Sequence, residues 1–193
     1  MKNKIILVGG YCAAGKSTFA RKLSQELNIP CFEKDTIDET LCDGFGRESK
    51  VYEMGSENVA FDLMLHISER FLQTEKPCIF ENVFVLEELN KIKSLLEKYN
   101  CECLLFILKG NPDVMFERYA ERDRTGERHW IHYPAENGSN DGVSKNWFIN
   151  DMPKMYKLEE AEIGQKIIVD TTSFDKINYD DLFSIAKRFI MDT

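Results

Sequence analysis

A short stretch near the N-terminus constrains this chain more than any other. Residues 10–17 read Gly-Tyr-Cys-Ala-Ala-Gly-Lys-Ser and match the pattern G-x-x-x-x-G-K-[ST]. An apolar run at residues 5–8 precedes them, as in a buried strand, and residues 17–27 follow with helical periodicity. Glycines let the backbone curl so that its N–H groups face one anion, and the helix adds its positive end. The combination predicts a loop that binds the phosphates of a nucleoside triphosphate.

The residues of this loop have separate expected tasks. Lys16 can reach the β- and γ-phosphates as a mobile positive charge, and the Ser17 hydroxyl can ligate Mg²⁺. ATP and Mg²⁺ are therefore the expected cofactors. The residues expected to contact the nucleotide in this part of the chain are Gly10, Ala13, Ala14, Gly15, Lys16, Ser17 and Thr18.

Composition and charge narrow the class of protein. The 193 residues are 43% hydrophobic and 30% charged, which suits one core, so we expect a single domain over residues 1–193. The first apolar run is too short for a signal peptide and no run approaches a membrane span, so we expect a cytoplasmic protein without a membrane partner. The net charge of -8 disfavours nucleic acid as a partner, and the six cysteines fit reduced thiols. Either a monomer or a homodimer fits this composition.

Strand-like and helical segments alternate along the chain. The expected strands are residues 5–8, 31–33, 78–81, 103–108 and 166–170, and the expected helices are residues 16–27, 55–73, 86–99, 112–122 and 179–191. This alternation predicts an α/β fold, namely a three-layer α/β/α P-loop NTP hydrolase fold with a five-stranded parallel sheet. In the second expected helix, Val59, Leu63 and Ile67 recur at helical spacing and predict its apolar face.

The connection at residues 123–150 breaks this alternation. It is rich in charged residues, glycine, asparagine and aromatic residues, and it is longer than most connections inside a compact domain. A stretch of this kind is either a functional lid or a disordered segment. We expect an arginine-rich lid at about residues 123–150.

Two acidic residues follow expected strands. Asp35 comes just after the second strand, where ligands of open α/β sheets bind, and it could accept the proton of a hydroxyl or hold a Mg²⁺-bound water. Alternatively, Asp35 caps a helix that begins near residue 36. Glu81 ends the third strand at a position suited to an acid that organises Mg²⁺, although an outer-shell or substrate-binding role is also open.

Four arginines lie close together after the fourth strand. Arg118 and Arg122 are four residues apart and share one helix face, and Arg124 and Arg128 follow at the entrance to the expected lid. Positioned cations stabilise the charge on a phosphoryl group in transfer, so these arginines are candidates for that task. The alternative is a solvated charged helix, because acidic residues interleave with them.

The order of these features resembles the small-molecule phosphotransferases of the P-loop kinase group. This group includes the nucleoside monophosphate, shikimate, gluconate and chloramphenicol kinases and AAA-type uncharacterised ATP-binding kinases. Residues 33–39 are similar to the segment in which the chloramphenicol phosphotransferase type carries its proton-accepting aspartate, which implies Asp35 as the base. Arg118 and Arg122 resemble the lid entrance of adenylate kinases, where the first arginine stacks on adenine and the second meets the ATP phosphates.

Two further segments extend the resemblance. Residues 128–132 resemble an Arg-His-Pro-Gly-His stretch of uncharacterised ATP-binding proteins in the group, with Trp130 and Ile131 replacing proline and glycine. Asp170, Thr171 and Thr172 correspond to the loop that commonly frames adenine. The acceptor signatures of the shikimate and adenylate kinases are absent from the sequence, so the acceptor stays open.

The sequence therefore predicts an ATP- and Mg²⁺-dependent kinase that phosphorylates a hydroxyl of a small molecule, either a metabolite or an antibiotic-like compound. Ser17 and Glu81 are the expected metal ligands. The residues expected to act in catalysis are Lys16, Asp35, Arg122, Arg124 and Arg128. The acceptor pocket is expected between residues 36–69 and the lid, lined by Phe32, Phe45, Tyr52, Phe84 and His132.

Two other functions fit parts of the sequence. One is a polynucleotide or nucleotide-sugar kinase, and the acidic composition argues against its polynucleotide form. The other is a nucleotide-dependent switch that hydrolyses ATP to change its grip on a protein partner. Such switches carry a water-positioning element, for which the sequence shows no clear signature.

Overall fold

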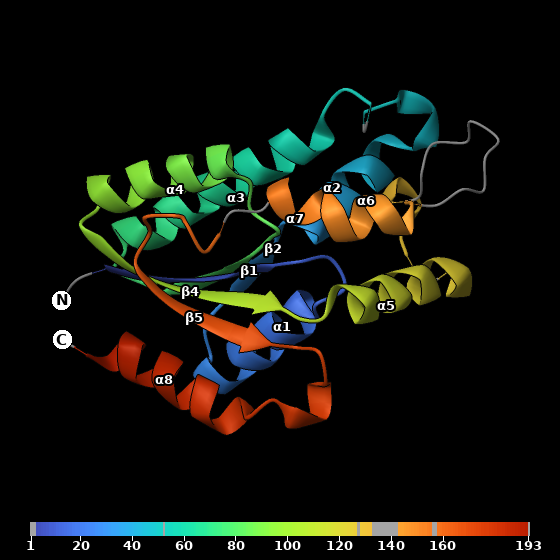
Figure 1. The fold of residues 1–193 in the computed structure, drawn as a ribbon. Helices are drawn as coiled ribbons and strands as arrows, with labels where there is room; N and C mark the ends of the chain where they lie inside the picture. Colours follow the sequence, from blue (N-terminus) through green and yellow to red (C-terminus); the bar gives the residue numbers. More distant parts are fainter. Residues whose placement is uncertain (1–2, 52, 127, 133–142, 156–157, 193) are drawn as a thin grey trace.

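Five parallel strands form the single sheet of the described chain (Figure 1). The structure is a computed structural model that describes residues 3–51, 53–126, 128–132, 143–155 and 158–192. Along the sheet the strands follow the order β2-β3-β1-β4-β5. Their bounds are β1 (Asn3–Gly10), β2 (Cys31–Glu33), β3 (Cys78–Glu81), β4 (Cys101–Lys109) and β5 (Gln165–Asp170). All five predicted strands and their parallel arrangement are thus confirmed.

Helices cover both faces of this sheet, which confirms the predicted three-layer fold (Figure 1). The α-helices are α1 (Lys16–Leu27), α2 (Lys34–Phe45), α3 (Ser56–Gln73), α4 (Leu86–Lys98), α5 (Pro112–Thr125), α6 (Lys145–Asn150), α7 (Met152–Met155) and α8 (Tyr179–Met191). Three 3-10 turns accompany them: η1 (Arg47–Ser49), η2 (Trp130–His132) and η3 (Phe174–Lys176). None of the helices in the described ranges is long and apolar enough to cross a bilayer.

The connection at residues 123–150 is more regular than the sequence suggested. The helix expected to end at residue 122 continues to residue 125, because Gly126 supplies the left-handed conformation that closes it. Farther on, α6 packs against α5 through the buried Phe148. Residue 127 and residues 133–142 of the expected lid lie outside the described residues.

The strand β1 divides the core into two parts. Ile5 and Leu7 point to the face covered by α3 and α4, and Ile6 and Val8 point to the face covered by α1 and α8. All four side chains are fully buried, as expected for a parallel strand flanked on both sides and on both faces. The continuous apolar run of this strand therefore follows from its central place.

The apolar face predicted for α3 is wrong. Val59 is 52% exposed and Leu63 is 39% exposed, whereas Ala60 and Met64 are fully buried. The buried face also holds Ser68, whose hydroxyl bonds to carbonyls of its own helix and so enters the core satisfied. Hydropathy alone misplaced the face, because alanine and serine occupy part of it.

The turn into β5 depends on a glycine. Gly164 has a φ angle of 52°, and a Cβ atom there would lie 2.1 Å from the carbonyl oxygen of Cys103 in β4. The backbone of the turn thus runs against the neighbouring strand more closely than any side chain allows.

Replacing Gly164 by alanine should lower the free energy of unfolding by about 2 kcal/mol or more, because the new methyl group collides with β4. The matched control is Gly44→Ala in α2, where a Cβ meets no atom within 4 Å. This control should be as stable as the parent or up to about 1 kcal/mol more stable. Denaturant unfolding measures both variants, and equal stability of the two would contradict the close packing at residue 164.

Candidate active site

The phosphate loop, residues 10–17, joins the end of β1 to the start of α1. Ala13 and Gly15 have φ angles of 58° and 81°, conformations that turn N–H groups of a loop toward one concave side. A Cβ at Gly10 would lie 1.9 Å from the carbonyl oxygen of Leu108 in β4, so this close approach requires glycine. The loop therefore has the shape of an anion-binding nest at a helix N-terminus, which fits the phosphates of a nucleotide.

Three polar side chains meet beside the phosphate loop. The Ser17 hydroxyl donates to Glu81 Oε2 at 3.0 Å, and Lys16 Nζ lies 4.0 Å from Glu81 Oε1. Lys16 also donates to the carbonyl of Tyr11 at 3.1 Å. Glu81 reaches the loop because β3 pairs with β1 and sets Glu81 opposite Val8. The hydroxyl and carboxylate oxygens are hard ligands of the type that Mg²⁺ prefers, so Ser17 and Glu81 fit this metal.

Burial controls the ionisation of Glu81. The residue is 3% exposed, and the loss of solvation raises the pKa of its carboxyl to about 7. The Lys16 ammonium opposes this rise, and the negative charge of Asp35 adds to it. A cation bound beside Glu81 would favour its charged form, so the site is suited to receive positive charge.

Asp35 lies in the first turn of α2, on the exposed surface next to this group. The helix begins at Lys34, so its N-cap is Glu33 and the interpretation of Asp35 as the cap is wrong. Asp35 is close enough to Glu81 to affect the pKa of that carboxyl. It comes to this edge because β2 pairs with β3 and sets Glu33 opposite Glu81. The Glu33 carboxylate accepts two hydrogen bonds from Arg21, from Nε at 2.7 Å and from Nη2 at 2.6 Å.

Arg118 is fixed on the loop that follows β5. Its Nη1 and Nη2 donate to the carbonyls of Thr171 and Thr172 at 2.7 and 2.9 Å. The same loop is tightened at Asp170, which accepts from the Thr172 hydroxyl at 2.6 Å and from its N–H at 2.9 Å. These bonds lower the pKa of Asp170. The structure thus brings together Arg118 and the loop predicted to frame the base.

The sequence analysis missed Phe174. The Arg118 guanidinium carbon lies 3.8 Å from the centre of the Phe174 ring. A Cβ at Gly15 would lie 2.8 Å from that ring, so the ring also covers the end of the phosphate loop. The position two residues after Thr172 was the only sequence signal that could have drawn attention to it.

Two of the other three arginines contact acids near their own helix. Arg124 pairs with Glu121 and is 71% exposed, and Arg128 donates to Asp123 at 2.6 Å and is 14% exposed. Arg122 is exposed on α5. The pairing foreseen for a solvated charged helix therefore occurs for Arg124 and Arg128 in this ligand-free chain. A role of the three arginines in transfer stays a prediction.

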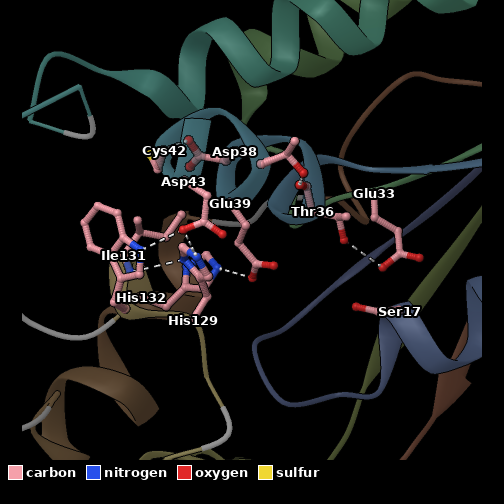
Figure 2. Close-up of polar contacts among 12 residues, drawn as sticks. Ser17, Glu33, Thr36, Asp38, Glu39, Cys42, Asp43, His129, Ile131 and His132 are labelled. Atoms are coloured by element: carbon pink, nitrogen blue, oxygen red, sulfur yellow. Dashed lines mark hydrogen bonds and ion pairs between the residues drawn. The ribbon is translucent and has the colours of Figure 1, made fainter. Parts of the chain in front are cut away.

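The segment of residues 128–132 is docked on α2 (Figure 2). His132 Nε2 lies 2.9 Å from Glu39 Oε1, and His129 Nε2 lies 2.9 Å from Asp43 Oδ1. The indole N–H of Trp130 also donates to Asp43 at 3.1 Å. The stretch that resembles Arg-His-Pro-Gly-His therefore connects the end of α5 to α2.

The contacts on α2 place the docked segment near Asp35 along the helix. Asp35, Glu39 and Asp43 follow at four-residue intervals and lie along one face of α2. Because Glu39 holds His132, that histidine lies about one helical turn from Asp35. The exposed Asp35 is thus near Glu81 and on the same helix as the residue that holds His132.

The structure argues against part of the predicted lining of the acceptor pocket, and the rest stays a prediction. His132 contacts Glu39 on α2, the helix that carries Asp35. Phe84 is fully buried in the core and cannot line a pocket, and Phe32 packs on the rings of two other phenylalanines of the core. Phe45 is 64% exposed, and Tyr52 lies outside the described residues.

A hollow of about 660 Å³ lies elsewhere, lined in part by Lys4, Asn100 and Gln165. These residues lie at the amino ends of β1, β4 and β5, away from the phosphate loop. Ligands of open α/β sheets bind beyond the carboxyl ends of the strands, so we assign no role in nucleotide binding to this hollow.

Solved structures share this fold over nearly the whole chain. A putative kinase from Chloroflexus aurantiacus j-10-fl has a TM-score of 0.77 and 21% identity, covering 97% of this chain and 95% of its own. Kti12 from Chaetomium thermophilum, in complex with ADP-AlF3, has a TM-score of 0.63 and 14% identity. The match covers 96% of this chain and 98% of the Kti12 chain. A gluconokinase from Sinorhizobium meliloti 1021 has a TM-score of 0.55 and 14% identity. The match covers 97% of this chain and 91% of the gluconokinase chain. The likeness establishes the fold of P-loop kinases.

A family model supplies the remaining comparison. No curated protein is significantly similar in sequence to this chain. The model AAA_33, described as AAA domain, matches residues 5–135, which include the phosphate loop, Asp35, Glu81 and the four arginines. Because the match spans more than half of the sequence, the chain belongs to this AAA domain family.

Proposed function

We propose that the protein is an ATP- and Mg²⁺-dependent kinase that transfers the γ-phosphoryl group of ATP to a hydroxyl of a small molecule. The observation that supports this most strongly is the meeting of Lys16, Ser17 and Glu81 at the phosphate loop. Beside them lies Asp35, an exposed acid on a different element. The first three residues suit a metal-bound triphosphate, and the fourth suits an acceptor that must lose a proton.

Nucleotide binding rearranges the contacts of Lys16. Its ammonium exchanges the Tyr11 carbonyl and the Glu81 carboxyl for oxygens of the β- and γ-phosphates, while the amides of the phosphate loop bind the same anion. Ser17 and Glu81 would hold Mg²⁺, which would neutralise charge on the phosphates. A cation bound beside Glu81 would favour the charged form of its carboxyl.

Transfer then needs a base and positive charge. As the acceptor oxygen bonds to the γ-phosphorus, the bond to the ADP oxygen breaks and Asp35 takes the hydroxyl proton. Arg122, Arg124 and Arg128 supply charge to the transferring group when the lid at about residues 123–150 closes, and closure excludes water. Arg124 and Arg128 must release Glu121 and Asp123 to do so.

The acceptor site lies beside Asp35, at the amino end of α2 and next to the docked segment 128–132. Asp35 lies in the first turn of α2, and His132 contacts Glu39 on the same helix. Solved structures with the same fold include a gluconokinase and a sugar kinase, whose names refer to hydroxyl-bearing acceptors. Their likeness supports a small hydroxyl compound as acceptor for this chain as well.

Incubation with MgATP and a cell metabolite extract should yield new phosphorylated compounds, detected by mass spectrometry. The Lys16→Ala variant should yield none, because it cannot hold the phosphates. ADP release without any phosphorylated product would contradict the kinase proposal and favour a switch that hydrolyses ATP. Products of nucleic-acid size, formed only at low salt, would favour a polynucleotide kinase.

With the acceptor found in this way, Asp35→Asn should lower kcat by about 100-fold to 10,000-fold, because the amide cannot take the hydroxyl proton. The Kd for MgATP should stay within about twofold of the parent value. Asp62→Asn, on the exposed side of α3, is the matched control and should leave turnover unchanged. Full turnover by Asp35→Asn would remove Asp35 from the mechanism.

The ligand-free protein should lose stability from Glu81 as the pH rises. Because the folded-state pKa of about 7 exceeds the usual value of 4.5, the folded state holds a proton that the unfolded state has lost between these pH values. Relative to the parent, Glu81→Gln should therefore gain about 3 kcal/mol in unfolding free energy between pH 4 and pH 8.

Denaturant unfolding at several pH values measures how the difference in unfolding free energy between the two proteins changes with pH. A difference that is the same at every pH does not affect this measurement. The control Glu48→Gln changes an exposed side chain and should follow the parent at every pH. A Glu81→Gln curve parallel to that of the parent would contradict the buried, proton-holding state of Glu81.

A further inference from the structure

The ring of Phe174 bridges two parts of the nucleotide site. Its centre lies 3.8 Å from the guanidinium carbon of Arg118, and its edge covers Gly15, where an added Cβ would be 2.8 Å from a ring carbon. The ring is nevertheless 41% exposed. A half-exposed phenylalanine thus covers the end of the phosphate loop in the ligand-free chain.

Arg118 offers this ring a fixed, flat surface. Two of its nitrogens donate to the carbonyls of Thr171 and Thr172, and the loop is anchored because the Thr171 N–H donates to the Lys109 carbonyl at 2.8 Å. Thr171 is fully buried. The guanidinium fork is therefore used for holding the loop and does not turn toward a phosphate. Its planar face remains, and such a face stacks on flat π systems.

The ring lies between the phosphate loop and the loop that is predicted to frame the base. A triphosphate seated in residues 10–17 leads its ribose and base away from the loop along the neighbouring surface. Phe174 already spans that surface from Gly15 to Arg118. The face of the guanidinium that Phe174 covers accommodates one stacked ring, so a base that stacks on this face must displace the phenylalanine.

The ring lies on a short turn. Phe174 begins the three-residue turn η3, which is held by the Ile177 N–H donating to the Phe174 carbonyl at 3.3 Å. Because the side chain is 41% exposed, its ring can leave by rotation of the side chain while the turn keeps its shape. The stack on Arg118 is therefore a reversible contact on a rigid partner.

We infer that Phe174 is an intramolecular stand-in for the nucleotide base. In the free protein it occupies the face of Arg118, and the base of MgATP displaces it, so this residue lowers nucleotide affinity by competition. The inference rests on the proposed function, because it requires that the phosphate loop binds a nucleotide.

Calorimetry on the full chain with Phe174→Ala and Phe174→Trp tests the inference. The Kd for MgATP should fall by about twofold to thirtyfold in Phe174→Ala, the range set by one cation–π contact. It should rise in Phe174→Trp, because indole stacks on a cation more strongly than phenyl. Mg²⁺-tripolyphosphate, which has no base, is the control ligand and should bind all three proteins with Kd values within about twofold.

The order of affinities decides the outcome. MgATP affinity that falls in the order alanine, phenylalanine, tryptophan supports the stand-in. The reverse order would show that the Phe174 ring contributes to binding of the base. Equal affinities would show that the ring has no effect on nucleotide binding. Either result would overturn the inference. If the parent binds tripolyphosphate but not MgATP, the base site is refuted, and if it binds neither ligand, the proposed function itself fails. Thermal unfolding of each variant confirms that this half-exposed site tolerates the change.

Discussion

The central place of β1 is the constraint on which the rest of the structure depends. Because β3 and β4 pair with it on either side, the strand is buried on both faces and its last residue meets the backbone of β4. Parallel strands end at the same edge of a sheet, so this pairing places the phosphate loop, Glu81 and the start of α2 next to one another. Residues far apart in sequence thus form one site through strand register alone.

Residues of the candidate site contact one another and the neighbouring backbone. Lys16 rests on Glu81 and on the Tyr11 carbonyl, and Phe174 rests on Arg118. Burial also raises the pKa of the Glu81 carboxyl to about 7. We propose that Lys16 exchanges its contacts for phosphate oxygens and that the nucleotide base displaces Phe174.

Sequence alone predicted the sheet and the phosphate loop because both depend on local patterns. Apolar runs identified the strands, and the glycine and lysine spacing identified the loop. The face of α3 was misplaced because Ser68 is satisfied by its own helix, which hydropathy does not record. The docking of His132 on Glu39 and the stack of Phe174 on Arg118 could not be predicted, because each joins segments more than fifty residues apart with no local pattern. The roles of Asp35 and the arginines of the lid remain predictions.

The central claim is that the phosphate loop and Glu81 together bind a nucleotide with its metal. Equilibrium titration of the protein with ATP, in the presence of Mg²⁺ and again with a chelator of divalent cations, tests it most directly. The account predicts saturable binding of one nucleotide per chain that is weakened strongly by the chelator and by Glu81→Gln, and abolished by Lys16→Ala. ATP binding that is unchanged by the chelator and by Lys16→Ala would contradict this claim, and so would the absence of any ATP binding.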